Sequence, residues 1–199
     1  MSKCYVELNQ EFSDTWCPRF KQLYDRVHET QNCHHVWWTY VLHPSRLKRD
    51  YLDEFPWLTE IPSYDINDEK NTIIFFRSNG QKNSHVKAHI DPNEIDWSIV
   101  LPVQNCTDET VTNWVEPIGD VVEERAKTSA GNKDVKMLGN NTKIIDSYCF
   151  TNKAALFNGG QWHEVRISHN RDEDRVLGKL WTPKLSKEHM LDVCKQWIN

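Results

Sequence analysis

The chain has 199 residues, of which 38% are hydrophobic and 11% aromatic, and this length suits one domain with a substantial core. Its 24 basic and 29 acidic residues give a net charge of −5, which argues against a surface specialised for nucleic acid. No apolar run reaches the roughly 18 residues of a membrane span, and the start, MSKCYVELNQEF, lacks the apolar core of a signal peptide, so we expect a cytoplasmic protein.

Two helices are predicted before residue 71. In the first, between Pro18 and Gln31, apolar residues recur at helical spacing, and Pro18 suits a first helical turn. The second covers residues 44–55 and is followed by an irregular, proline-bracketed link. We therefore expect residues 1–70 to form a helical support for the rest of the domain.

From Asn71 onward the sequence is typical of short β-strands. β-Branched and aromatic segments alternate with Gly, Pro, Asn and Asp, which are turn residues. The expected strands are residues 72–77, 86–90, 97–103, 110–115, 144–150, 154–157 and 175–181. Many short strands without intervening helices predict an antiparallel sandwich or barrel.

The remaining segments complete the expected organisation. Residues 118–141 are polar and charged, and we interpret them as a long loop or insertion, the least ordered part of the domain, near the mouth of the site. Residues 183–199 predict a C-terminal helix that starts at Ser186 as N-cap and packs on the sheet. The chain is thus expected to be a single domain, 1–199, with its β core at 71–182.

The first candidate site lies at the end of a predicted strand, in HVKAHIDPN. Strict alternation of side chains places His89 and Asp91 on one face, close enough to bind one ion. Asp91-Pro92-Asn93 is a turn signal, so the pair sits where a site can open to solvent. His85 would share the same face and is a reserve ligand, whereas the pair alone is more often an ordinary surface contact.

A third ligand follows downstream, in ALFNGGQWHEV. His163 comes directly after a strand and a glycine-containing turn. Two His and one carboxylate on a β scaffold form the facial triad that binds non-haem Fe(II) and leaves positions open. His169, in a polar stretch, is expected to be a solvated loop residue.

Arg175 begins the next predicted strand, twelve residues after His163. Alternation puts Arg175, Leu177 and Lys179 on one face. A guanidinium on an inner face needs an anion, because a buried unpaired charge is costly. A dicarboxylate cosubstrate would provide that anion, and an ion pair with the acidic residues 172–174 is the alternative.

This order, H-x-D, then His, then Arg on successive strands, resembles the Fe(II)- and 2-oxoglutarate-dependent oxygenases. FFRSNGQKNSHVKAHID, WSIVLPV, ALFNGGQWHEV and RVLGKLWTPKLSKE are similar to the aspartyl/asparaginyl β-hydroxylase branch, over about residues 73–185. The resemblance implies a mainly β fold, a jelly-roll or cupin-like double-stranded β-helix with flanking N-terminal helices and a C-terminal helix.

The resemblance also implies the ligands. By position, His89, Asp91 and His163 would bind Fe(II), and Arg175 would hold the far carboxylate of 2-oxoglutarate, with O2 as the other cosubstrate. Asp91 is a departure, because the best-known members of that branch lack this carboxylate.

Two further residues are assigned to the cosubstrate by position. Ser98 stands near the place where members of the branch carry a second anchoring Arg, and its hydroxyl would donate to the cosubstrate. Arg77, on the strand before the metal pair, would contribute a charge, although a surface or core-edge role explains it equally well. Leu177 stands where many oxygenases carry a Ser after the anchoring Arg.

The expected activity is hydroxylation of a C–H bond in a small-molecule or peptidyl substrate, most simply an amino-acid side chain, with no nucleic-acid or membrane partner. Two alternatives stay open. A cupin-like metalloprotein of another class, such as an isomerase or a cosubstrate-free dioxygenase, would keep the ligands without needing Arg175. A non-catalytic β-sandwich binding module would contain the same residues incidentally.

Overall fold

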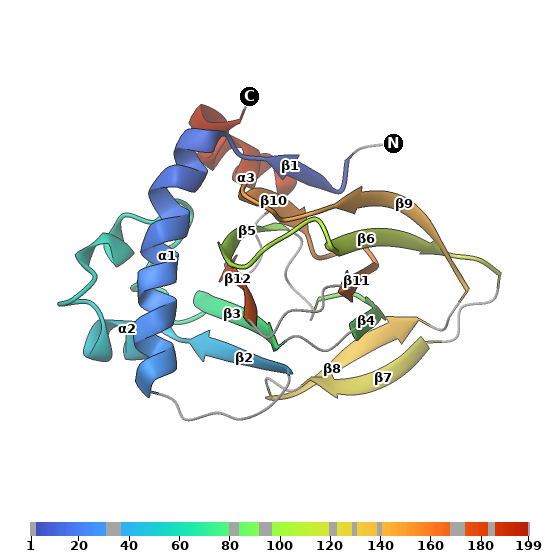
Figure 1. The fold of residues 1–199 in the computed structure, drawn as a ribbon, viewed down its shortest axis with the longest axis horizontal. Helices are drawn as coiled ribbons and strands as arrows, with labels where there is room; N and C mark the ends of the chain where they lie inside the picture. Colours follow the sequence, from blue (N-terminus) through green and yellow to red (C-terminus); the bar gives the residue numbers. More distant parts are fainter. Residues whose placement is uncertain are drawn as a thin grey trace.

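The structure is a computed structural model that describes residues 3–30, 37–79, 84–91, 97–119, 123–128, 131–138, 141–167, 174–182 and 186–198. Two antiparallel sheets face each other, and the long helix α1 lies on the outer side of one of them (Figure 1). Among the described helices, none is long and apolar enough to cross a bilayer.

Each sheet contains six described strands. The first sheet has the order β1 (Tyr5–Glu7), β10 (Ala155–Asn158), β5 (Trp97–Gln104), β12 (Asp174–Trp181), β3 (Thr72–Asn79) and β2 (Trp37–Leu42). The second sheet has the order β7 (Glu123–Thr128), β8 (Gly131–Leu138), β4 (Ser84–His89), β11 (His163–Ile167), β6 (Thr110–Pro117) and β9 (Thr142–Tyr148).

The chain alternates between the two sheets. β3, β5, β10 and β12 belong to the first sheet, whereas β4, β6, β9 and β11 belong to the second. Apart from the hairpin β7–β8 and the pair β6–β9, neighbouring strands of this core are therefore distant in sequence, as in the double-sheet jelly roll. The expected mainly β, jelly-roll fold is confirmed.

The helix α1 (Gln10–Thr30) covers the outer face of the first sheet. Phe20 and Tyr24 pack edge-on against Phe75 of β3, with ring centroids 6.1 and 5.5 Å apart. The helix begins earlier than expected, because the side chain of Asn9 accepts a hydrogen bond from Phe12 N at 2.9 Å and caps the first turn. Pro18 thus lies inside the helix, where burial of the apolar stripe offsets the lost backbone bond.

The N-terminal region is not wholly helical. β1 and β2 add the outermost strands of the first sheet by pairing with β10 and β3. The second expected helix is shorter, α2 (Pro44–Asp50), and the link contains a 3-10 turn, η1 (Pro56–Thr59). Residues 1–70 therefore extend the sheet as well as supporting it.

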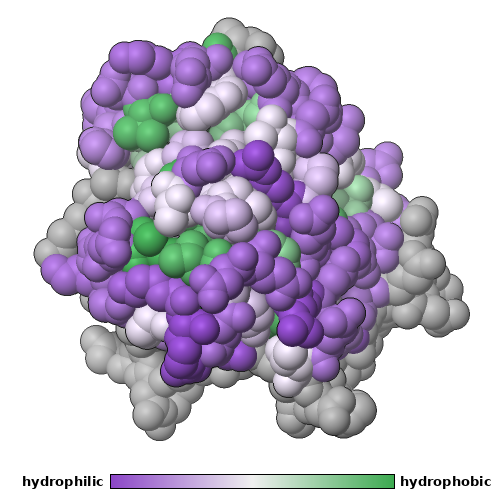
Figure 2. Space-filling view, turned by 90° about the vertical axis from the view of Figure 1, so that its left-hand side faces the viewer, coloured by the Kyte–Doolittle hydropathy of each residue, from purple (hydrophilic) through white to green (hydrophobic). Residues whose placement is uncertain are grey.

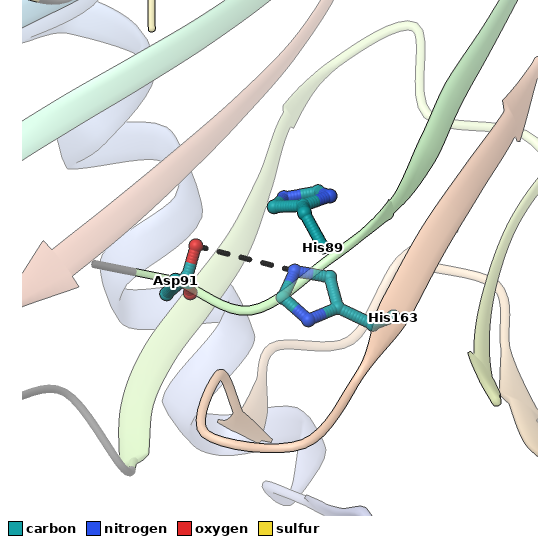
Figure 3. Close-up of side chains that lie close together, drawn as sticks. All are labelled: His89, Asp91 and His163. Carbon is teal, nitrogen blue, oxygen red and sulfur yellow. Dashed lines mark ion pairs between the residues drawn. The ribbon is translucent and has the colours of Figure 1, made fainter. Parts of the chain in front are cut away.

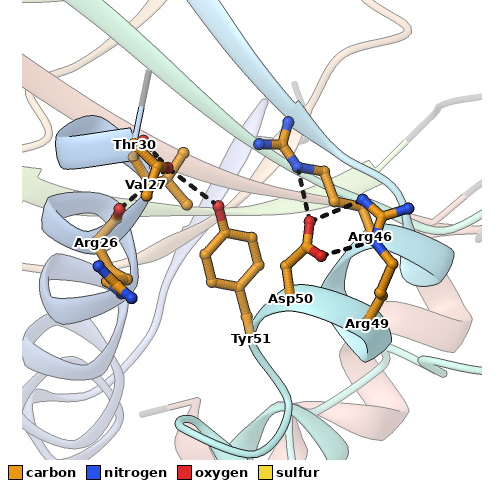
Figure 4. Close-up of polar contacts among 7 residues, drawn as sticks. All are labelled: Arg26, Val27, Thr30, Arg46, Arg49, Asp50 and Tyr51. Atoms are coloured by element: carbon orange, nitrogen blue, oxygen red, sulfur yellow. Dashed lines mark hydrogen bonds and ion pairs between the residues drawn. The ribbon is translucent and has the colours of Figure 1, made fainter. Parts of the chain in front are cut away.

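The segment after α2 is attached to the end of α1 (Figure 4). The hydroxyl of Tyr51 lies 3.5 Å from that of Thr30, which also donates to the carbonyl of Val27 at 2.9 Å. Within α2, Oδ1 of Asp50 lies 2.7 Å from Nε of Arg49. The outward face of this helical layer is largely hydrophilic, with small separate apolar areas (Figure 2), so α1 directs its apolar stripe inward.

The segment 118–141 differs from the expected loop. It contains the strands β7 and β8, which pair antiparallel, and β8 pairs with β4 where Met137 lies opposite His89. β7 and β8 thus form an inserted hairpin between β6 and β9, and β8 runs beside His89; a position at the mouth of the site stays a prediction. The relative order of the segment also stays a prediction.

The C-terminal helix α3 (Lys187–Val193) begins at Ser186 as predicted. The hydroxyl of Ser186 accepts a hydrogen bond from the backbone N–H of His189 at 3.2 Å. Met190 and Cys194 are buried in the main core, so this helix packs on the domain before the final 3-10 turn, η2 (Lys195–Trp197).

Candidate metal centre

Three side chains from two strand ends meet at one point between the sheets (Figure 3). His89 is the last residue of β4 and lies directly opposite His163, the first residue of β11. Asp91 follows β4 and is fixed by a hydrogen bond from its backbone N–H to the carbonyl of Gly159, at 3.0 Å. One potential ligand atom from each side chain lies within 4.8 Å of the others.

A β-bulge decides which histidine of β4 faces this point. His163 pairs with His89, but Val165 pairs with Val86, so β4 has one extra residue in this interval. The extra residue places His85 on the opposite face, where its Nε2 donates to Glu164 at 2.9 Å. The expectation that His85 shares the face of His89 and serves as a reserve ligand is wrong for this reason.

The two imidazole rings present the same nitrogen to the site. Nδ1 of His89 lies 2.9 Å from the carbonyl of Lys87, and Nδ1 of His163 lies 2.9 Å from that of Gln161. Because a carbonyl only accepts, each Nδ1 carries a proton, so in the neutral ring Nε2 is the nitrogen with the free lone pair. This arrangement, with the far nitrogen fixed by a carbonyl, is the one that metal-binding histidines use.

The protonation states also suit metal binding. Burial lowers the pKa of His163 to about 3, against the opposing effect of Asp91. Burial alone would raise the pKa of Asp91, but the charge of Lys179, with the two histidines, outweighs it and lowers this pKa to about 2. At neutral pH the site therefore holds a neutral imidazole and an ionised carboxylate, the forms that bind metal.

Gly159 makes the close approach of Asp91 possible. A Cβ at this position would lie 2.3 Å from Oδ2 of Asp91 and 3.1 Å from its Cγ, so any larger residue would displace the carboxylate. The pair Gly159-Gly160 was recognised in the sequence only as a turn. Nothing in that pattern indicates that the first glycine supports a ligand.

The donor set and its spacing fit a divalent metal. Ligand atoms at roughly 2.1 Å from one ion lie roughly 3 Å apart in adjacent positions and at most roughly 4.2 Å apart in opposite ones, and the three potential ligand atoms lie within 4.8 Å of one another. A bound metal would therefore draw the three side chains closer together. Two imidazoles and one carboxylate on one side of an ion leave the other side open.

Arg175 lies in the interior between the sheets. Its side chain is buried, and its Nε and Nη2 have no hydrogen-bond partner among the described residues. Burial lowers its pKa. Asp174, the described member of the neighbouring acidic group, pairs with Arg77. Arg175 is therefore a buried cation without an anionic partner among the described residues.

The two weaker cosubstrate candidates, Ser98 and Arg77, lie on opposite faces of the first sheet. Ser98 lies on the inner face of β5, opposite Phe157, with its hydroxyl buried and without a partner among the described residues. Arg77 lies opposite Val176, which belongs to the core beneath α1, so it faces away from Arg175. The structure thus brings Ser98, but not Arg77, to the interior face. His169 lies outside the described residues.

Lys179 is a member of the site that the sequence did not single out. It shares the inner face of β12 with Arg175, and its ammonium is in contact with Oδ2 of Asp91. The alternation of β12 predicts its direction, but no local signal predicts a contact with a residue 88 positions away.

An open pocket of about 360 Å³ lies against the turn that precedes β11. One side of it is formed by the turn between β10 and β11, and the other by the start of α3. Its lining residues are Trp97, Asn158, Gly160, Gln161, Ser186, Lys187 and Glu188.

No family model and no curated protein matches the sequence. Among solved structures, the chain is similar to a crystal structure of an oxidoreductase of the 2OG-Fe(II) oxygenase family from Burkholderia pseudomallei, with 14% identity and a TM-score of 0.34. The alignment covers 58% of this chain and 43% of that one, so the chain spans less than half of that protein. A similarity this weak does not establish a shared activity.

Proposed function

We propose that the chain is an Fe(II)- and 2-oxoglutarate-dependent dioxygenase that hydroxylates a C–H bond of an amino acid or a peptidyl side chain. His89, Asp91 and His163 would hold the metal, and the sequence segments around them favour the aspartyl/asparaginyl β-hydroxylase branch. Bound Fe(II) and 2-oxoglutarate would supply an O2-dependent oxidation of the C–H bond, coupled to decarboxylation of the cosubstrate. The side chains around the site would orient the bound groups and exclude water.

The observation that carries the proposal is the buried guanidinium of Arg175. It faces the same interior as the three ligands, because Lys179, on the same face of β12, is in contact with Asp91. Arg175 lies four residues before Lys179, about 13 Å of strand, a gap that an arginine side chain and a five-carbon dicarboxylate can bridge. Its planar fork matches a carboxylate with two hydrogen bonds.

The surrounding side chains would orient the cosubstrate and exclude water. Ser98 offers a buried hydroxyl without a described partner, which suits a carboxylate oxygen. Val100, Phe157 and Leu177 belong to an apolar cluster on the inner face. A cupin of another class would leave Arg175 without a role, and a non-catalytic module would leave the matched imidazole orientations unexplained.

The direct test is anaerobic titration with Fe(II) and then 2-oxoglutarate, followed by assays of succinate release against separate pools of free amino acids and peptides. We expect wild type to bind both, and His163→Ala to lose metal binding. A wild type that binds no metal would refute the proposal. Succinate release stimulated by neither pool would refute the substrate class.

Arg175→Leu tests whether Arg175 holds the far carboxylate of 2-oxoglutarate. Each hydrogen bond to a charged group contributes roughly 1.5–3 kcal/mol, so losing two should weaken 2-oxoglutarate by about a hundredfold or more, while metal affinity is retained. Arg175→Lys should recover only part, because the fork is lost. Arg77→Leu is the matched control, since Arg77 faces the other side of the sheet; in the folded protein it should leave 2-oxoglutarate affinity unchanged. Equal affinity in wild type and Arg175→Leu would favour the cupin alternative.

A further inference from the structure

The inner face of β12 carries a second buried cation. The side chain of Lys179 is 6% exposed, and its ammonium contacts Oδ2 of Asp91. Its neighbours on the adjacent strands, Ile74 and Val100, are apolar. Asp91 is the carboxylate that compensates this charge within the described ranges.

An aromatic ring fixes the position of this ammonium. The Nζ of Lys179 lies 4.9 Å above the centre of the Phe157 ring, a cation–π contact. The same ring packs perpendicular to His163, with centroids 4.8 Å apart. Phe157 therefore contacts both Lys179 and His163, and both of these side chains face Asp91.

The contacts divide the two oxygens of Asp91 between different neighbours. Oδ2 is turned toward Lys179 and toward the Cα of Gly159. Oδ1 is turned toward His163, with Nε2 at 4.0 Å. A metal ion would therefore meet Oδ1 first, while Oδ2 stays with the lysine.

From this division we infer that Lys179 is the internal counter-ion of Asp91, a positioning residue that neutralises the carboxylate in the metal-free protein and competes with the metal for it. The inference rests on the proposed function only in requiring that the site binds a divalent metal. Lys179 keeps the empty site intact, because a buried carboxylate without a partner is destabilising. It weakens metal binding, because its charge repels a second cation at Oδ1.

The direction in which Mn²⁺ affinity changes when Lys179 is replaced separates this role from simple structural support. With Lys179→Met, the metal-free protein loses the counter-ion, whereas in the metal-loaded protein the ion itself compensates Asp91. We expect Mn²⁺ to bind this variant more tightly than wild type, by on the order of tenfold, and the melting temperature of the metal-free variant to fall. Lys179→Arg keeps the charge and should stay close to wild type in Mn²⁺ affinity.

The experiment is calorimetric titration of the full chain with Mn²⁺ alone, together with thermal unfolding with and without the ion. Equal or weaker Mn²⁺ binding by folded Lys179→Met would overturn the inference. Absence of binding in wild type would overturn the proposed function as well, so the two failures are distinguishable.

A stability cycle provides a readout without metal. Asp91→Asn leaves the ammonium buried without its partner, and Asp91→Asn/Lys179→Met removes both charges. We expect the double variant to be more stable than Asp91→Asn alone in chelator-treated samples. Additive effects of the two substitutions would contradict a counter-ion pair. This measurement also covers the case in which Lys179→Met alone fails to fold.

Discussion

Gly159→Ala tests whether the turn before β11 sets the position of the metal carboxylate. The new Cβ would lie 2.3 Å from Oδ2 of Asp91, and ordinary contacts begin at 3.4 Å, so the carboxylate must retreat by roughly 1 Å. The backbone cannot follow freely, because the N–H of Asp91 donates to the carbonyl of Gly159 at 3.0 Å. Metal–oxygen bonds are only about 2.0–2.2 Å long, so the displacement is large for a ligand.

We expect Mn²⁺ affinity to fall by about 10- to 100-fold, the range seen when support of a ligand is lost, which corresponds to about 1.4–2.7 kcal/mol. The assay is calorimetric titration, with urea unfolding to confirm that the fold persists. Wild-type Mn²⁺ affinity in Gly159→Ala would refute the reasoning.

Gly178→Ala is the matched control, because it adds the same methyl group on the other side of the first sheet. Its Cβ would lie 3.1 Å from Cδ1 of Phe20 and 3.2 Å from Cγ2 of Val103, which crowds α1 against the sheet. Overpacking of this kind costs about 1–3 kcal/mol. Stability should therefore fall while Mn²⁺ affinity is kept, the reverse of the pattern for Gly159→Ala.

Two further predictions concern residues outside the metal centre. Glu164 is buried on the outer face of β11 and accepts hydrogen bonds from Asn113 at 3.0 Å and His85 at 2.9 Å, so Glu164→Gln should lower the free energy of unfolding by about 1–3 kcal/mol. Urea denaturation measures this, and an unchanged midpoint would contradict it. Burial raises the pKa of Cys17 and of Cys194 to about 12, so both should resist iodoacetamide at about pH 8 in the native protein and react after unfolding. Mass spectrometry locates the label, and native labelling at the unfolded rate would argue against burial.

Local sequence patterns predicted most strands of the jelly-roll core, because each of these alternates or carries an apolar run, but β11 (His163–Ile167) was not among the expected strands. The sequence also gives the chain order of the four site candidates, His89, Asp91, His163 and Arg175. Their convergence depends on the antiparallel pairing of β4 with β11, which places His163 opposite His89. Only the strands and the order of the candidate residues are features of local sequence or of chain order.

The features that were missed depend on partners distant in sequence. The bulge in β4 appears only in its pairing with β11, and with it the outward turn of His85 toward Glu164. The strands of 123–138 carry many charged residues and were interpreted as a loop, because they lack the apolar pattern of a buried strand. Lys179 acquired a role only through its contact with Asp91 across the interior.

The turn at residues 158–161 contacts both the metal centre and the open pocket. On one side, the carbonyls of Gly159 and Gln161 accept hydrogen bonds from Asp91 and His163. On the other side, Asn158, Gly160 and Gln161 line the open pocket. The pocket and the metal centre thus share a single wall of backbone. A change in the backbone of this turn would therefore act on Asp91 and His163 through their hydrogen bonds, without contact with either carboxylate or imidazole.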